Sequence, residues 1–377
     1  MPSFQLKVIR ELYPIFWSKA CEMTQMLGDA AREPEVELGV WCTRVTLDII
    51  GIAGLGQDFN SLKNPEDEFV AQYNEVLEPD YQKALFFGLS LMFSARVIRA
   101  LPWDIPRHLN QISTNLHKFG KDLSRDRRQE FAKSSVSETE KDKRKDILSL
   151  LVKSNDFTDA ELADQVLTMM AAGHETTSST LSWCAYLLAT HPQIQDELRA
   201  EIRATLPSPN DLATSTITAA TVDAMPLLNA VCNETTRLYP TVPLTSRIAI
   251  RDTTLGSQVV PAGTLLFIVP WAINRLTAYW GKDAMEFRPH RWINADGTPN
   301  NTGGATSNYS IMTFLHGPRS CIGQGFARAE LKCLLAALVG RYTFEVTRER
   351  KTYYPDGVVT SKPANGMWLK VKEVEGW

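Results

Sequence analysis

Apolar residues recur along most of this chain at intervals of three and four, the spacing that places them on one face of an α-helix. Strict alternation of apolar and polar residues, which is typical of strands, becomes common only after Pro240. The pattern predicts helices over residues 3–31, 36–55, 66–78, 107–133, 159–190, 224–238 and 324–339. We therefore expect a mainly α-helical protein with a small β-rich region.

Start and stop signals support several of these helices. Thr158 and Glu161 have the spacing of a capping box, which predicts the start of the 159–190 helix. Gly340 is predicted to end the 324–339 helix in a left-handed conformation. The glycines at 51, 54 and 56 follow a helix, and no βαβ unit surrounds them. They indicate helix packing and a helix stop rather than a dinucleotide-binding loop.

Short strand-type runs are predicted at residues 247–250, 264–269, 344–347 and 367–371, and an Asn/Gly/Thr-rich loop at 294–308. We expect one domain over residues 1–377. Its helical part would be 1–240, and 241–377 would hold the strands and a cysteine-containing loop with its helix.

Composition narrows the class of protein without defining it. The chain has 377 residues, 44% of them hydrophobic, and a net charge of −3. This near-neutral charge provides no electrostatic attraction for nucleic acid or for an anionic membrane surface. Six cysteines are scattered without a Cys-x-x-Cys pair. This distribution argues against a disulfide framework or structural zinc, and it favours a reducing compartment.

The N-terminal residues contain no recognisable signal peptide or membrane anchor. Longer uncharged stretches, at 176–195 and 253–274, contain Thr/Ser clusters or Pro and Gly, so a soluble chain is expected. The apolar run at 84–95 is too short to span a bilayer. It is either core or an exposed patch that contacts a membrane or admits an apolar ligand. Residues 134–145 are predicted to be a charged surface loop.

Cys321 has the most specific surroundings in the chain. It lies at the predicted N-terminus of the 324–339 helix, where backbone N–H groups and the helix dipole lower the pKa of a thiol. Gly317 allows a tight turn, and Gly323 lets a flat ligand approach the backbone. Arg319 offers donors to a carboxylate. These features together indicate a haem-thiolate site, whereas the plain alternative is a buried structural cysteine.

A polar stretch interrupts the apolar 159–190 helix. It runs Ala172-Gly173-His174-Glu175-Thr176, followed by further Thr and Ser residues. Such local conflicts tend to mark function, although a solvent-facing polar notch is the alternative. The stretch is not a zinc-protease motif, because no second histidine follows four residues after the first. The Thr176 hydroxyl can bond back to the Ala172 carbonyl and loosen the helix locally.

These motifs resemble those of the cytochrome P450 family. Residues 314–323, FLHGPRSCIG, match the haem-binding signature Phe-x-x-Gly-x-Arg-x-Cys-x-Gly at every defined position. Residues 172–177 are similar to the motif of the helix that crosses the distal haem face. Glu234 and Arg237 match the family's Glu-x-x-Arg pair, and Arg291 matches its third partner. The sequence as a whole is most similar to fungal microsomal members of the family. The resemblance implies the cytochrome P450 fold.

The resemblance assigns roles to individual residues. It implies that Cys321 is the iron ligand, that Phe314, Gly317 and Gly323 frame the haem, and that Arg319 and Arg247 hold propionates. Ala172 and Gly173 would leave room for dioxygen, and Glu175 and Thr176 would relay protons to it. Glu234, Arg237 and Arg291 would form a structural network. More weakly, motif position implies pocket walls at Met170, Thr241, Val242, Pro243, Leu244 and Val359.

The function that this resemblance implies is mono-oxygenation of an apolar organic substrate, such as a specialised metabolite or lipid. The cofactor would be haem b. Electrons would come from an NADPH-dependent cytochrome P450 reductase, with cytochrome b5 as an additional donor, because no motif here binds NADPH directly. The family implies the cytosolic face of the endoplasmic reticulum membrane. No nucleic-acid partner is expected.

One departure from the family pattern raises alternatives. Residue 1 aligns after the helix that carries the family's Trp-x-x-x-Arg motif, so we expect the anchor, a first β-sheet and one propionate clamp to be absent. A remnant without turnover is therefore one alternative. A haem-thiolate isomerase or dehydratase is the other, although Glu175 and Thr176 argue against it.

Overall fold

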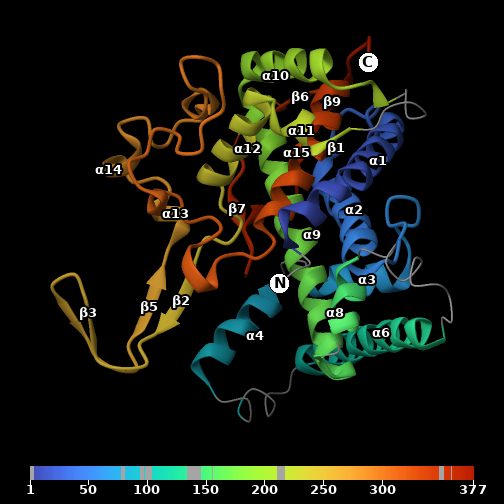
Figure 1. Cartoon of the computed structure of the whole chain (residues 1–377), viewed down its shortest axis with the longest axis vertical. Coiled ribbons are helices and arrows are strands. Elements are labelled where there is room, and N and C mark those ends of the chain that lie inside the picture. Colours follow the sequence, from blue (N-terminus) through green and yellow to red (C-terminus); the bar gives the residue numbers. More distant parts are fainter. Residues whose placement is uncertain are drawn as a thin grey trace.

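The structure is a computed structural model, shown in Figure 1. It describes residues 4–77, 81–93, 97, 104–133, 146–154, 156–209, 217–347, 352–357 and 359–377. The charged loop predicted at 134–145 lies outside the described residues. Within them the protein is mainly helical, as its hydrophobic pattern predicts.

A single long helix, α9 (Asp159–Thr190), runs through the middle of the molecule (Figure 1). It begins at the predicted capping box, in which the Thr158 hydroxyl accepts from the Glu161 N–H and the Glu161 carboxylate accepts from the Thr158 N–H. The second half of α9 is buried on almost every face, because α2, α12 and α15 surround it. The residues that the sequence places in the polar stretch therefore lie at the centre of the fold.

The predicted helices are confirmed with small changes at their ends. The principal ones, besides α9, are α1 (Leu6–Ala30), α2 (Leu38–Ile50), α6 (Ile105–Lys133), α12 (Pro226–Leu238) and α15 (Gln324–Arg341). Shorter helices are α3 (Glu68–Leu77), α4 (Tyr81–Met92), α8 (Ile147–Ser154), α10 (Pro192–Thr205), α11 (Ala219–Asp223), α13 (Pro270–Ile273) and α14 (Thr277–Trp280). Single 3-10 turns occupy Pro289–Trp292, Asn308–Ser310 and Gly317–Arg319.

The strands form small antiparallel sheets. β1 (Val36–Glu37), β9 (Trp368–Glu373) and β6 (Tyr342–Glu345) make one sheet in that order, and β7 (Pro355–Asp356) pairs with β8 (Lys362–Pro363). The runs predicted at 247–250 and 264–269 overlap β2 (Thr245–Ile248) and β5 (Leu265–Ile268), which pair with each other, and those predicted at 344–347 and 367–371 overlap β6 and β9. The hairpin of β3 (Thr253–Leu255) with β4 (Gln258–Val260) was not predicted. Figure 1 shows these two hairpins projecting from the helical body.

The glycines that follow α2 end a helix, as expected. Residues Gly51–Leu55 form one turn of π-helix, and Gly56 closes it with a φ of 67°. A Cβ at Gly51 would lie 2.4 Å from the Gln57 carbonyl oxygen, so only glycine fits this turn. Among the described residues, Leu38–Leu55 is the one helical stretch long and apolar enough to cross a membrane, and 67% of it is buried. It packs on α9 as a core helix of this fold.

The apolar run at 84–95 lies largely in α4, and part of it is at the surface. Leu85 is 37% exposed and Phe93 is 49% exposed. For these two side chains the structure favours the exposed patch over the buried core. Ser94 and Ala95 lie outside the described residues.

The predicted stop at Gly340 is wrong. The helix α15 continues to Arg341 and ends at Tyr342, in an extended conformation. Gly340 is buried inside this helix, and a Cβ there would lie 2.1 Å from the ring of Trp377. Close contact with a distant aromatic side chain, rather than a left-handed turn, explains this glycine.

Gly340→Ala is expected to lower the free energy of unfolding by about 1–3 kcal/mol, because the added methyl group overpacks the contact with Trp377. Urea unfolding would measure this loss. In a Trp377→Ala background the same substitution should cost much less, since the clashing ring is gone. An equal cost in both backgrounds would contradict the packing explanation.

Candidate functional site

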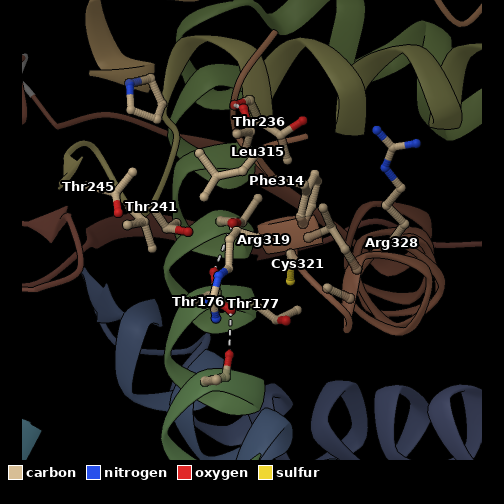
Figure 2. Close-up of a pocket in the computed structure, with 17 residues that line it drawn as sticks. Thr176, Thr177, Thr236, Thr241, Thr245, Phe314, Leu315, Arg319, Cys321 and Arg328 are labelled. Carbon is tan, nitrogen blue, oxygen red and sulfur yellow. Dashed lines mark hydrogen bonds between the residues drawn. The ribbon is translucent and has the colours of Figure 1, made fainter. Parts of the chain in front are cut away.

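A cavity of about 250 Å³ lies between α9, the cysteine loop and the first turns of α15. Figure 2 shows its side chains gathered around one space that Cys321 enters from the loop side and Thr176 borders on α9. The lining residues are Ala172, Thr176, Thr177, Thr180, Thr236, Thr241, Val242, Thr245, Pro270, Thr313, Phe314, Leu315, Arg319, Cys321, Ala327, Arg328 and Leu331. Motifs that are far apart in the sequence therefore meet at one place.

Threonines dominate the cavity wall, yet the wall is largely apolar. The hydroxyl of Thr176 donates to the Ala172 carbonyl at 2.8 Å, as predicted, and Thr177 donates to Gly173 at 3.2 Å. Thr180 bonds back in the same way, to the Thr176 carbonyl at 2.8 Å. In this structure the hydroxyl protons therefore point to backbone carbonyls rather than into the cavity. The expected local loosening is not seen, since α9 is regular α-helix throughout.

Cys321 is held by a tightly turned loop. Gly317 has a φ of 74°, and the Cys321 N–H donates to the Phe314 carbonyl at 2.8 Å. Leu315, which lines the cavity, has a φ of 57°, a conformation that non-glycine residues rarely adopt. Such strain is typical of a loop whose shape serves a ligand.

The predicted fall in the pKa of Cys321 is wrong for the protein without a bound metal. Burial raises the pKa above the ordinary thiol value, and the N–H groups of Gly323 and Gln324 only partly offset it. The helix N-terminus therefore acts in the predicted direction but is the weaker effect. A coordinated metal deprotonates a thiol outright, so a thiolate here depends on a cation in the cavity.

The two arginines expected to hold acidic groups lie at and beside the cavity. Arg319 lines it directly and has no ion-pair partner among the residues that the structure describes. Arg247 lies one step away: its guanidinium donates to the Ser246 carbonyl at 2.7 Å and to the Thr245 hydroxyl at 3.2 Å, and Thr245 lines the cavity. Both cations are available to a ligand with carboxylates at its edge.

Gly323 leaves open space beside the sulfur. A Cβ there would make only an ordinary contact, 3.9 Å from Cys321 Sγ, and its backbone is not in the left-handed region. Among the residues that the structure describes, no contact requires glycine at this position. A flat group that lies against the backbone next to the sulfur would require it.

Gly173 was predicted to leave room for dioxygen, but the structure gives it a role in helix packing. A Cβ at Gly173 would lie 2.7 Å from Ile50 Cδ1, so the glycine allows α2 to pack closely on α9. It is not among the residues that line the cavity. Ala172, one turn before Thr176, lines the cavity instead.

Glu175 lies next to the cavity without lining it. Its carboxylate is 3.6 Å from the ammonium group of Lys362 on β8. Beside it, His174 is fully buried and its pKa falls to about 4, because burial disfavours the charged imidazolium. His174 Nδ1 lies 3.0 Å from the Met170 carbonyl oxygen. Glu175 and Lys362 thus form an ion pair directly behind Thr176.

Of the six residues that were more weakly predicted as pocket walls, only two are among those that line the cavity. Thr241 and Val242 line the cavity. Met170 is fully buried elsewhere, and Leu244 and Val359 are 48% and 70% exposed. The cavity wall does not include Met170, Pro243, Leu244 or Val359.

Sequence reasoning missed several residues of the cavity wall. Three of them, Ala327, Arg328 and Leu331, follow Cys321 at helical spacing along α15, so that periodicity could have identified them. Thr236 and Thr313 could not have been found in this way. Their place depends on a contact between distant segments, in which the Thr313 hydroxyl donates to the Thr236 carbonyl at 2.7 Å.

Glu234, Arg237 and Arg291 come together as the motif predicts. The buried Glu234 carboxylate accepts two hydrogen bonds from Arg237, at 2.8 Å each, and one from Arg291 at 2.9 Å. It also accepts from the Arg288 N–H and the Trp292 indole. Arg237 in turn donates to the carbonyls of Asn274 and Ala284. This network joins α12 to the irregular chain that leads to the cysteine loop.

Glu234→Gln is expected to lower the free energy of unfolding by about 3–5 kcal/mol, since it leaves the fully buried guanidinium group of Arg237 without its counter-charge. Denaturant unfolding would measure it. Glu345→Gln is the matched control, because its partners Lys370 and Lys372 are exposed. The control should cost less than about 1 kcal/mol. Similar small losses in both variants would mean that the network does not stabilise the fold.

The described residues contain no group of three or more His, Cys, Asp or Glu side chains that could hold a metal ion. A metal at this site would therefore need further ligands from outside the protein, as a porphyrin supplies.

Comparison with known proteins agrees with the geometry. The chain is 38% identical over 384 residues to cytochrome P450 monooxygenase sphH of Aspergillus fumigatus, across 100% of this chain and 69% of that protein. It is 36% identical to cytochrome P450 monooxygenase buaD of Petromyces alliaceus, across 100% of this chain and 71% of the relative. It is 33% identical to cytochrome P450 monooxygenase FUM15 of Gibberella moniliformis, across 99% of this chain and 70% of that protein.

The chain thus spans about 70% of the length of these relatives. The family description "Cytochrome P450" matches residues 1–369. This match covers α9, the Glu234 network, Cys321 and α15, which are the elements that build the cavity. The chain therefore belongs to the cytochrome P450 family.

Proposed function

We propose that this chain is a haem-thiolate monooxygenase that inserts one oxygen atom of dioxygen into an apolar organic substrate. The observation that carries the proposal is the position of Cys321 and Thr176 on the wall of one cavity. A sulfur ligand and a hydroxyl on a core helix are the groups that this chemistry needs on either side of a flat cofactor. The names of the relatives support the same activity for this chain.

The residues at the site fit haem b. Cys321 would be the iron ligand, and Arg319, with Arg247 beside it, would bind the propionates. Phe314 and Leu315 offer apolar surface to the ring, and Gly323 offers open backbone. When bound, the haem supplies dioxygen activation, driven by electrons that the protein receives from outside.

Proton delivery would fall to α9. The Glu175 carboxylate lies 3.6 Å from the ammonium group of Lys362 on β8. Thr176 follows it directly and faces the cavity. For this the Thr176 hydroxyl would turn from the Ala172 carbonyl, to which it donates at 2.8 Å, toward a ligand in the cavity. These two residues would hold a proton at the cavity and exclude bulk water from it.

The substrate class follows from the wall. Threonines whose protons are engaged by backbone carbonyls, together with Val242, favour an apolar substrate such as a specialised metabolite or a lipid. The electron source would be an NADPH-dependent reductase, with cytochrome b5 as an additional donor. The exposed Leu85 and Phe93 of the α4 region are compatible with a location at the endoplasmic reticulum membrane surface.

A haem-thiolate isomerase or dehydratase would use the same cysteine loop without external electrons. Turnover that does not depend on the reductase would favour it. A remnant without turnover would bind no haem, or would bind haem without oxidising a substrate.

Cys321→Ala is expected to abolish the long-wavelength absorption band that reduced, CO-bound thiolate haem gives, because no other side chain at the cavity supplies a soft anionic ligand. A reduced-CO difference spectrum of the purified chain would measure it. Cys333→Ala, which removes a buried thiol from the same region, should keep the band. An unchanged band in Cys321→Ala would exclude this residue as the ligand.

Thr176→Ala is expected to lower the product formed per NADPH by at least about tenfold, with hydrogen peroxide formed instead, because the hydroxyl no longer holds a proton at the cavity. Product, peroxide and NADPH would be quantified with the reductase present. Thr168→Ala removes a hydroxyl that also bonds back to a backbone carbonyl, but on the exposed face of α9. This variant should form as much product per NADPH as wild type. If wild type and both variants form the same amount of product per NADPH, Thr176 does not deliver the proton.

A further inference from the structure

Seven threonines line the cavity, and the hydroxyls of all but one are engaged by the protein itself. Five of these hydroxyls donate to backbone carbonyls, namely those of Thr176, Thr177, Thr180, Thr236 and Thr313. The hydroxyl of Thr245 accepts from the Arg247 guanidinium at 3.2 Å. Thr241 differs from the other six, because its hydroxyl has no hydrogen-bond partner among the residues that the structure describes.

The Thr241 side chain is buried, with 7% of its surface exposed, and it lines the cavity. Figure 2 shows Thr241 and Thr245 at one side of the cavity and Cys321 at the other. A hydroxyl in such a place must find its hydrogen bond within the cavity, because it has lost most of its contact with bulk water. Water can serve while the cavity is empty. A ligand that displaces this water without replacing its hydrogen bond loses affinity.

Two hydrogen bonds connect the backbone of Thr241 to the central helix. The Thr241 carbonyl accepts from the Ser361 N–H, directly before β8, at 2.7 Å. The Ser361 carbonyl in turn accepts from the hydroxyl of Ser179 on α9 at 2.6 Å. Thr241 is thus held in position relative to the helix that carries Thr176. A hydroxyl that is positioned in advance loses less entropy when it binds a ligand.

We propose that Thr241 is a specificity-determining residue, whose hydroxyl binds an uncharged oxygen atom, a hydroxyl or a ketone, on an otherwise apolar substrate. The inference rests on the function proposed above, since it names the substrate class of the same site. A pure hydrocarbon fits less well, because it leaves the Thr241 hydroxyl without a partner. A carboxylate also fits less well, because one hydroxyl does not compensate a buried charge.

This hydrogen bond would orient the substrate in the cavity. With its oxygen held at Thr241, that end of the molecule is kept away from Cys321, and the apolar remainder is left to face the reacting groups. The new oxygen atom would then enter an apolar carbon rather than the group already oxidised. The substrate would reach this site only after an earlier reaction that forms an alcohol or a ketone.

A matched pair of probes tests the proposal by isothermal titration calorimetry on the haem-loaded chain. The compounds are adamantanol and methyladamantane, both substituted at the bridgehead, which share one apolar cage and differ only in a hydroxyl or a methyl group. The ratio of their dissociation constants measures the contribution of the hydroxyl. In Thr241→Val, which keeps the shape and removes the hydroxyl, the preference for the alcohol should fall at least about fivefold.

Two further variants separate the hydrogen bond from packing. Thr241→Ser keeps the hydroxyl and should keep the preference of wild type. Thr180→Val is the matched control, because Thr180 also lines the cavity and is also 7% exposed, but its hydroxyl donates to the Thr176 carbonyl. Its preference for the alcohol should equal that of wild type. Circular dichroism would confirm that each variant is folded.

An equal preference in wild type and Thr241→Val would overturn the proposal, as would an equal loss in Thr241→Val and Thr180→Val. A wild-type chain that binds neither compound would overturn it too, since the cavity must accept an apolar alcohol. The titration involves neither reductase nor dioxygen. Failure of the proposed monooxygenase activity would therefore appear in the product analysis and leave this comparison of affinities unchanged.

Discussion

The carboxylate of Glu234 is the contact on which the rest of the site depends. It accepts hydrogen bonds from Arg237 on α12 and from Arg288, Arg291 and Trp292 in the distant 3-10 turn. The network extends through Asn274, which donates to the Thr313 hydroxyl and accepts from the Met312 N–H. The chain between β5 and α15 contains only short helical turns. Polar contacts to α12, rather than regular structure, therefore fix the path of the backbone into the cysteine loop.

Local patterns predicted the helices and the motif positions well, because periodicity and capping are properties of neighbouring residues. The capping box at Thr158 and the back-bond of Thr176 were found in this way. The Glu234–Arg237 pair, three residues apart on one helix, was found for the same reason. That the chain forms one domain, and that it lacks an N-terminal portion of the family fold, stay predictions.

Three of the errors share a cause, since each depends on a contact with a distant segment. Gly340 was predicted from its place at the end of an apolar pattern, but its neighbour is Trp377. Gly173 was assigned to a ligand, but Ile50 of α2 occupies the space beside it. For Cys321 the local helix terminus was considered, whereas burial by the surrounding chain is the larger effect on its pKa. No sequence pattern encodes these neighbours.

The contact between Gly173 and Ile50 brings α9 close against α2. This close packing limits how far the threonine-bearing face can move back to admit a bulkier molecule. Adaptation to ligand size must then come from the opposite side, where Thr241, Val242 and Thr245 lead into the projecting β2–β5 hairpin. Among enzymes with this fold, selectivity for new substrates would arise from changes on the side of the β2–β5 hairpin, while the threonine-bearing face of α9 stays constant.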